Sequence, residues 1–377
     1  MAGIYLHIPF CKQACHYCDF HFSTNRSQQS QLVRAIISEI NLQKNYLPGE
    51  DVNTIYFGGG TPSLLTAAEL SSILDSIRKN YKLNSIPEIT LEANPDDIDE
   101  QTIYELAATG INRLSIGVQS FQDPILKYLN RAHTAASATE SFQLARQAGF
   151  SNITIDLIFA IPGLSDDDWR KEIRRAIELG PEHISAYSLT IEEKTFFGHK
   201  AAKGNLVVVD DDSAARQLEI LMAELDRAGF EQYEISNFCR PGFHSRHNSS
   251  YWKQEKYLGV GPSAHSYNGI SRQFNIRNNA LYVKSLESGK VPSEIEILTK
   301  QDHINEYILT SLRTSWGVNL EKLRIGNNHD ILALQKEYLQ DLFTRDLAIV
   351  EEGFLKLTKK GRLLADKISS DLFVLAD

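Results

Sequence analysis

Short apolar runs and amphipathic stretches alternate along the first half of the chain. The apolar runs that predict strands lie at residues 3–8, 54–57, 89–93, 113–118, 153–159 and 183–189. Helical spacing of apolar residues predicts helices at 30–45, 66–81, 102–108, 135–148, 166–179 and 213–228. Strands that alternate with helices predict a parallel α/β sheet. Six such units favour a partial (β/α)6 barrel related to the TIM barrel over the closed barrel of eight.

The alternation stops after residue 229. Residues 231–277 are rich in aromatic residues, Gly, Asn and Ser, with short strand-like pieces. Beyond residue 292 the pattern predicts helices at 301–314 and 331–344, a hairpin at 347–357 and a last helix from about residue 359. Helices followed by a two-stranded wing predict a small winged-helix-like α+β domain. We therefore expect a barrel at 1–230, a connecting region at 231–295 and a C-terminal domain at 296–377.

The bulk composition restricts the class of protein. The chain has 377 residues, 42% of them hydrophobic and 23% charged, and a net charge of −9. This charge argues against a broad nucleic-acid surface. No run of eighteen apolar residues predicts a membrane span, and residues 1–10 do not resemble a signal peptide. We expect a cytoplasmic protein, with peripheral contact at a membrane left open.

Three of the four cysteines lie together after the first predicted strand. Cys11, Cys15 and Cys18 have the spacing C-x3-C-x2-C, and Cys239 is remote from them, so no local disulfide framework is implied. Three thiolates on one short loop indicate a metal centre. Iron–sulfur cubes are usually held by four cysteines, so three would leave one iron open.

Zinc is the alternative that the spacing leaves open. Structural zinc sites use four nitrogen or sulfur ligands, and His7, His16 or His21 could supply the fourth. The loop by itself favours an iron–sulfur cluster, because zinc ligands usually come as two well-separated pairs.

Unusual polar residues follow or end several predicted strands, which is where parallel α/β proteins bind ligands. A GGGTP segment at 58–62 offers close-approach backbone groups, although a plain glycine-rich turn explains it equally well by itself. Glu92 ends one predicted strand, Gln119 follows the next, and Asp156 lies within the one after that. Arg131 lies on a loop between these positions. Acids at strand ends commonly bind ribose hydroxyls, and Arg commonly pairs with a carboxylate. Each of these residues considered singly is more often structural.

The motifs YLHIPFC, FGGGTPS, LEANPDD, RLSIGVQSF, LNRAHT and IDLIFAIPGLS together resemble the coproporphyrinogen dehydrogenase-like branch of radical S-adenosylmethionine (SAM) proteins. The resemblance covers nearly the whole chain, in the family's order. It implies that Cys11, Cys15 and Cys18 bind a [4Fe–4S] cluster. It also implies a SAM site formed by Tyr5, Gly59, Gly60, Thr61, Glu92, Gln119, Arg131 and Asp156.

The chain departs from the oxygen-independent coproporphyrinogen III dehydrogenase itself. Cys18 is followed by Asp19 and Phe20, where the dehydrogenase has a further C-x-C, and the dehydrogenase's N-terminal extension is missing. The segment HNSSYW at 247–252 is similar to the HNxxYW signature of the HemW heme chaperones. This resemblance implies heme binding, with His247 as a heme contact. Spacing alone would favour a polar loop, and His244 and His265 are nearby alternative ligands.

The family resemblance leads to two hypotheses for function. The first is a heme chaperone that carries a [4Fe–4S] cluster and SAM and passes heme to acceptor heme proteins, respiratory and membrane-bound ones among them. It would lack decarboxylase activity and bind no nucleic acid, and a dimer is left open. The alternative is the dehydrogenase reaction, a SAM-dependent oxidative decarboxylation of coproporphyrinogen III in porphyrin biosynthesis. A winged-helix regulator that senses redox through the cluster is a third class.

Overall fold

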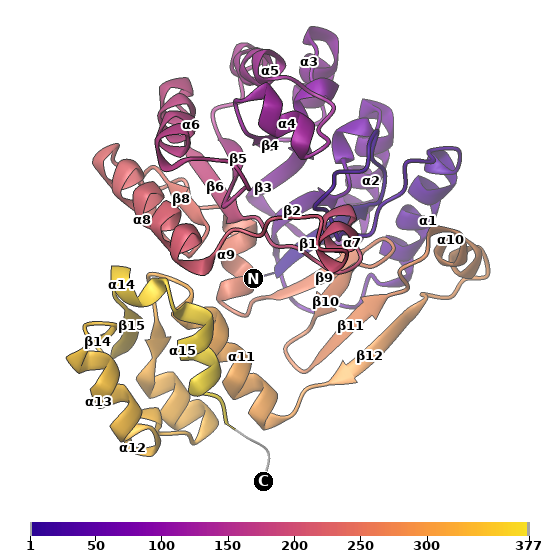
Figure 1. Cartoon of the computed structure of the whole chain (residues 1–377). Helices are drawn as coiled ribbons and strands as arrows, with labels where there is room; N and C mark the ends of the chain where they lie inside the picture. The colour runs from indigo at the N-terminus through magenta and orange to yellow at the C-terminus, as the bar shows by residue number, and fades with distance from the viewer. Residues whose placement is uncertain (1, 375–377) are drawn as a thin grey trace.

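In the computed structural model, which describes residues 2–374, six parallel strands form the centre of a twelve-stranded sheet. These strands are β1 (Ala2–Ile8), β2 (Val52–Gly59), β3 (Leu83–Ala93), β4 (Arg113–Gln119), β5 (Ile153–Phe159) and β6 (His183–Ser188). Each pairs in parallel with the next, so the predicted parallel α/β barrel is confirmed. The sheet curves, and its helices lie along the outer side of the curve (Figure 1).

The helices between these strands follow the predicted alternation. The longer ones are α1 (Gln29–Leu42), α2 (Ala67–Asn80), α3 (Glu100–Ala108), α5 (Ala135–Gln147), α6 (Asp166–Leu179) and α8 (Asp211–Arg227). Shorter turns of helix are η1 (Pro62–Leu64), η2 (Pro95–Asp97), α4 (Asp123–Tyr128) and α7 (Phe196–Ala202). Thr66 and Glu69 cap α2 reciprocally, which fixes its first turn. The apolar sides of the helices pack on the strands in one large core.

The sheet extends beyond the six predicted strands at both edges. On one side β9 (Lys256–Val260) pairs in parallel with β1, followed by the antiparallel strands β10 (His265–Tyr267), β11 (Ser271–Asn275) and β12 (Ser293–Ile297). On the other side β8 (Asn237–Cys239) pairs antiparallel with β6, and β7 (Glu231–Gln232) pairs antiparallel with β8. The helices α9 (Arg246–Trp252) and α10 (Asn279–Glu287) complete this region. Residues 231–295 therefore continue the barrel sheet, and the HNSSYW segment is helical; the unit boundaries at 230 and 295 remain a prediction.

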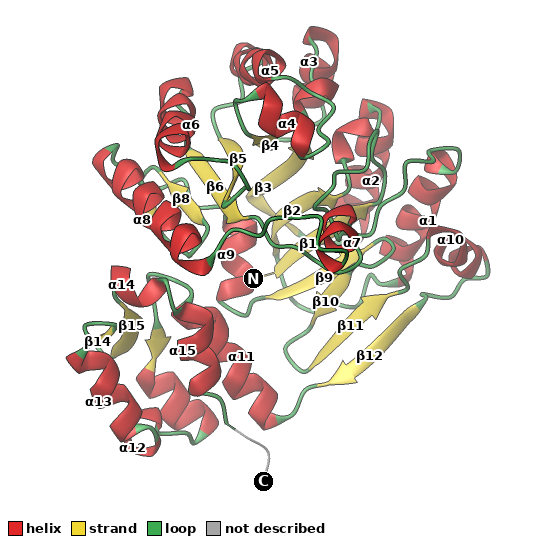
Figure 2. Cartoon of the chain, in the orientation of Figure 1, coloured by secondary structure: helices red, strands yellow, loops and turns green. Residues whose placement is uncertain are grey.

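The C-terminal unit has its own apolar core and a three-stranded antiparallel sheet. Its elements are α11 (Lys300–Leu312), β13 (Val318–Asn319), the π-helical turn η3 (Lys322–Gly326), α12 (Ile331–Leu334), α13 (Lys336–Thr344), β14 (Ala348–Glu351), β15 (Phe354–Leu357), α14 (Lys359–Arg362) and α15 (Ala365–Asp371). Figure 2 shows the helices around the small sheet. The predicted winged-helix-like domain is confirmed. The helix expected at 331–344 is divided between α12 and α13 at Gln335.

Across residues 2–374, no helix combines the length and the apolar character that crossing a bilayer requires.

Candidate cluster and cofactor site

The cysteine loop leaves β1 at the C-terminal edge of the parallel strands and is pinned at several points. Backbone hydrogen bonds of 2.7 Å from Ser23 N to Pro9 O and 3.1 Å from Cys11 N to Ser23 O close its base. Further along, His16 N donates to Leu129 O and His16 O accepts from Phe197 N. The loop is therefore held by neighbouring segments at both its base and its middle.

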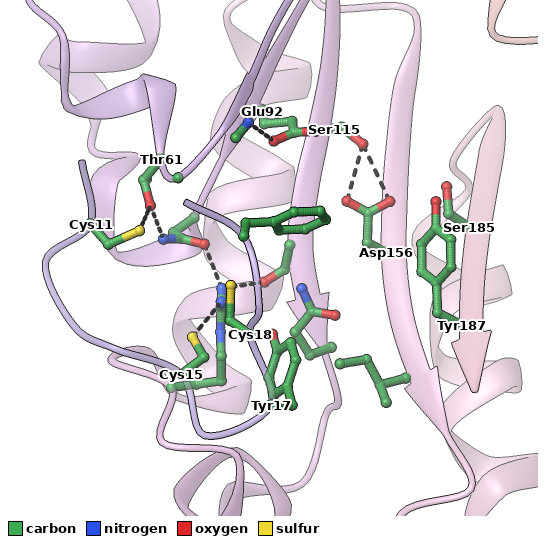
Figure 3. Close-up of a pocket in the computed structure, with 18 of the residues that line it drawn as sticks. Cys11, Cys15, Tyr17, Cys18, Thr61, Glu92, Ser115, Asp156, Ser185 and Tyr187 are labelled. Atoms are coloured by element: carbon green, nitrogen blue, oxygen red, sulfur yellow. Dashed lines mark hydrogen bonds between the residues drawn. The ribbon is translucent and has the colours of Figure 1, made fainter. Parts of the chain in front are cut away.

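The loop forms one wall of a cavity with a volume of about 590 Å³, here called the strand-end cavity. This volume lies within the usual range of about 300–1,000 Å³ for ligand sites. Figure 3 shows the three thiols on one side and strand-end side chains on the other. The predicted residues that line the cavity are Cys11, Cys15, Cys18, Gly59, Gly60, Thr61, Glu92, Gln119, Arg131 and Asp156.

The three thiols suit a cluster better than a single ion. Cys11, Cys15 and Cys18 are all free and partly exposed to the cavity. Within the described residues, no three His, Cys, Asp or Glu side chains converge to hold one metal ion. A zinc ion needs all its sulfur ligands at about 2.3 Å from one point, whereas a cube distributes its cysteines over different iron atoms. The donor geometry therefore favours a cluster over zinc.

The protonation of the thiols is consistent with a cluster site. Burial raises the pKa of Cys11 to about 12 and the pKa of Cys18 to about 11, so both are protonated near neutral pH in the metal-free chain. Metal ligands must be thiolates, and binding of iron replaces these protons. Binding of a cationic centre would therefore stabilise the thiolate form of these cysteines.

A chain of hydrogen bonds joins two of the cysteines through residues on two strand ends. The Thr61 hydroxyl donates to Cys11 Sγ at 3.5 Å and accepts from Asn94 Nδ2 at 3.0 Å. Arg131 donates to Asn94 Oδ1 and, at 3.4 Å, to Cys15 Sγ. Hydrogen bonds to ligand sulfurs tune the potential of a cluster. Asn94 was not predicted as a site residue, although it lies directly after β3 within the LEANPDD motif.

Two acids from β3 and β5, the strands on either side of β4, face the same cavity with partly satisfied oxygens. Glu92 accepts hydrogen bonds from the Tyr56 hydroxyl at 2.7 Å and from Gly59 N at 3.2 Å. Asp156 accepts from the Ser115 hydroxyl at 3.1 Å. Burial raises the pKa of Glu92 to about 7 and that of Asp156 to about 6. Both acids are therefore ready to exchange a proton or to bind a cationic or hydroxyl-bearing ligand near neutral pH.

The raised pKa of Glu92 predicts a pH-dependent stability. Its pKa rises from 4.5 to about 7 on folding, so the folded state favours the protonated acid. The unfolding free energy of the metal-free protein should therefore fall as pH rises from about 4.5 to 7 and then level off. Because the carboxyl is partly exposed to the cavity, we expect a fall of about 1–3 kcal/mol. Denaturant unfolding across this range should show a shallower slope for Glu92→Gln; equal slopes would contradict the assignment.

The glycines of the GGGTP segment are required by packing. Gly59 has φ +106°, and a Cβ on it would lie 2.6 Å from the His7 ring. A Cβ on Gly60 would lie 2.7 Å from the Phe10 backbone oxygen, at the base of the cysteine loop. The segment thus lets β2 approach the loop closely. Contact with SAM at this segment remains a prediction.

Gln119 lies at the end of β4 in the left-handed backbone region, with φ 66°. A non-glycine residue in this region is uncommon, and such residues gather at ligand sites. Its side chain lines the strand-end cavity, and its contact with SAM remains a prediction.

Tyr5 does not belong to the lining of this cavity. Its ring stacks on Tyr56 with centroids 6.1 Å apart, and its hydroxyl is 3.2 Å from His7 Nδ1. The structure thus places it beside Tyr56 and near Glu92, outside the lining of the strand-end cavity; contact with SAM remains a prediction.

His247 also lies away from the strand-end cavity, buried in α9. Its Nδ1 is hydrogen-bonded to Thr54 Oγ1 at 2.8 Å and its Nε2 to the Tyr251 hydroxyl at 2.9 Å. Both ring nitrogens are occupied, so His247 presents no free nitrogen to a heme iron in this arrangement. A role in heme binding remains a prediction, and the geometry supports an indirect role only.

Comparisons with known proteins agree with this geometry. Residues 5–176 match the model of the radical SAM superfamily. The heme chaperone HemW of Bacillus subtilis is 35% identical over 373 residues, which cover 98% of each chain. The heme chaperone HemW of Escherichia coli is 38% identical over 265 residues, 70% of this chain and 69% of that one.

A solved structure extends the comparison to the whole fold. Coproporphyrinogen III oxidase (HemN) from Escherichia coli, a radical SAM enzyme, superimposes with a TM-score of 0.84 over 99% of this chain and 90% of that chain. At 24% identity this likeness establishes the fold alone.

Proposed function

The chain belongs to the HemW family of heme chaperones, and from this premise we propose that it binds heme and transfers it to acceptor heme proteins. The observation that carries the proposal is the 35% identity with a HemW protein over 98% of both chains. The match spans the barrel and the C-terminal unit together.

We further propose that the strand-end cavity holds a [4Fe–4S] cluster and SAM. Cys11, Cys15 and Cys18 would bind the cluster, and Arg131 would hold the Cys15 sulfur while compensating negative charge. The bound cluster would supply an iron without a protein ligand, which can take an exchangeable ligand. The two acids, Glu92 and Asp156, are suited to the polar groups of SAM because their strands place them opposite the thiols (Figure 3).

The remaining parts of the proposal concern partners and place. We propose a cytoplasmic protein whose acceptors include respiratory heme proteins at the membrane. A dimer is compatible with this proposal, and the net charge of −9 supports the absence of a nucleic-acid partner.

Heme retention and transfer test the proposed function. Anaerobically reconstituted protein should retain about one heme per chain through desalting and should pass it to a heme-free cytochrome. The transfer should be visible as the appearance of the acceptor's absorption spectrum. Wild-type protein that retains no heme, or that transfers none, would contradict the proposal.

The alternative, decarboxylase activity, has its own readout. The same preparation, given SAM, a reductant and coproporphyrinogen III, should release neither CO2 nor protoporphyrinogen above a protein-free control. Stoichiometric release of CO2 would favour the dehydrogenase function instead.

A further inference from the structure

A second cavity of about 440 Å³ lies on the other side of the cysteine loop. It opens between the loop and strands β1, β9 and β10, and we call it the histidine cavity. Its lining residues are Tyr5, His7, Asp19, Phe20, His21, Tyr251, Tyr257, Ser263, His265 and Arg277. Asp19 and Phe20 line both cavities, so the two sites share one wall.

The two cavities differ in their donors for iron. Among the described residues, no histidine lines the strand-end cavity, whose thiols are already assigned to a cluster. Three histidines line the histidine cavity. Histidine is a usual axial ligand of heme iron. A heme that needs a nitrogen ligand therefore finds its donors only in the second of these cavities.

The three histidines are not equally available. Both nitrogens of His7 are occupied, by the Tyr5 hydroxyl at 3.2 Å and the His21 carbonyl at 2.9 Å. His21 uses Nε2 in a 2.7 Å hydrogen bond with Asn279. The imidazole of His265 forms no hydrogen bond with any residue in the described part of the chain and is exposed on β10. The His265 ring contacts the Phe274 ring with centroids 5.8 Å apart, while its two nitrogens form no hydrogen bond with the described residues.

The protonation state of His265 fits ligation. Partial burial and the nearby positive charge of Arg272 lower its pKa, so its imidazole is neutral at physiological pH. The neutral form is the one that binds iron.

The rest of the cavity provides flat apolar surface and one positive charge. Tyr251 and Tyr257 pack edge to face, 4.7 Å apart, in its wall. The Phe20 side chain is 70% exposed at the rim. Arg277 donates from its guanidinium to the Asp19 carbonyl, forms a 3.8 Å ion pair with the Asp19 carboxylate and remains half exposed. A porphyrin presents a flat apolar ring and two carboxylates, and these match aromatic walls and an arginine.

We propose that the histidine cavity is the heme site, with His265 as the axial ligand of the iron and Arg277 as the partner of a propionate. The aromatic residues Phe20 and Tyr257 would flank the porphyrin. This inference rests on the proposed heme-binding function.

The site also gives His247 a role as a positioning residue. Its Nε2 holds the hydroxyl of Tyr251, and Tyr251 lines the histidine cavity. Loss of His247 should therefore loosen the heme pocket without removing a ligand of the iron.

Heme titration of reconstituted full-length variants tests the site. His265→Ala should weaken heme retention by about 10-fold or more, and His265→Cys should shift the Soret band because thiolate replaces imidazole. Arg277→Ala should weaken retention by about 10-fold through loss of a charge-assisted pair. His199→Ala is the matched control, because His199 is exposed on α7 and lines neither cavity. Equal iron and sulfide contents would show that all variants fold around the cluster.

The outcomes distinguish a failure of the proposed heme site from a failure of the proposed heme-binding function. A His265→Ala protein with wild-type affinity and spectrum would overturn the site and leave heme binding itself intact. Wild-type protein that retains no heme would overturn the proposed function. His247→Ala should weaken retention while keeping the wild-type Soret position; loss of the histidine-ligated spectrum in that variant would instead make His247 the ligand and overturn the assignment to His265.

Discussion

Replacing Cys15 with alanine should reduce the iron and sulfide content of reconstituted protein to background. The strand-end cavity offers only three thiols in the described chain, and a cluster left with two protein ligands loses a third of its anchoring bonds. Arg131 would at the same time lose the sulfur that its Nη1 contacts at 3.4 Å. Anaerobic reconstitution followed by iron and acid-labile sulfide analysis, with the visible absorption spectrum, measures the effect.

Cys239→Ala provides the matched control for this experiment. Cys239 is fully buried on β8, opposite His183 of β6, and lines neither cavity. This variant should keep the wild-type iron and sulfide content. A Cys15→Ala protein with a full cluster, or wild-type protein that contains stoichiometric zinc instead of iron, would refute the assignment of the loop.

The central barrel could be predicted because its signals are local. β5 and α6 occupy Ile153–Phe159 and Asp166–Leu179, the same residues that the apolar pattern indicated. The strand is almost completely buried and the helix begins at a Ser165 cap, so composition and capping mark both ends. β3 begins earlier than predicted, at Leu83, because its first five residues mix apolar and polar side chains, include a proline and are mostly exposed, so they show no continuous apolar run.

The edges of the sheet could not be predicted in the same way. β9 pairs with β1, from the opposite end of the barrel sequence, and β10 has only three residues. Such strands are defined by their partners, since short mixed segments have no periodicity that separates them from loops. The antiparallel continuation through β11 and β12 depends on the same distant pairing.

The residues of the candidate site that lie at strand ends could be predicted from the sequence. The cysteine spacing and the acids Glu92 and Asp156 stand out in sequence because they are unusual at those positions. Asn94 and Ser115 did not, because an amide or a hydroxyl gains meaning only from its partner in space. No sequence signal indicated that His247 is buried, because its hydrogen bond with Thr54 of β2 joins residues that are distant in the chain.

Glu39 is a buried acid that the sequence pattern did not reveal. It lies fully buried in α1, among apolar residues that carry the helical spacing. Its carboxylate accepts hydrogen bonds from Asn275 Nδ2 at 2.7 Å, from Gly261 N at 2.9 Å and from the Tyr282 hydroxyl. Gln43, one turn further along α1, donates a fourth bond at 3.0 Å. One side chain thus joins α1 to β11, to α10 and to the turn that follows β9.

Replacing Glu39 with alanine should lower the free energy of unfolding by about 3–5 kcal/mol. The loss leaves several buried donors without an acceptor, and each such group costs about 1–3 kcal/mol. Glu39→Gln should cost less, because its amide oxygen still accepts from some of these donors. Glu140→Ala, an exposed acid on α5, is the control and should change the value by less than about 0.5 kcal/mol. Urea unfolding of the metal-free proteins measures all three.

The Glu39→Ala substitution should also disturb the histidine cavity. Gly261, which donates its N–H to Glu39, packs against the backbone of His7, and the turn that it begins carries Ser263, a lining residue of that cavity. Loss of the carboxylate frees this turn, so Glu39→Ala should weaken heme retention while Glu140→Ala should not. None of the backbone hydrogen bonds that hold the cysteine loop involves Glu39, so cluster content at low temperature should stay near wild type. An unfolding free energy within 1 kcal/mol of wild type would show that α1 and the β9–β11 segment are held together by apolar packing alone.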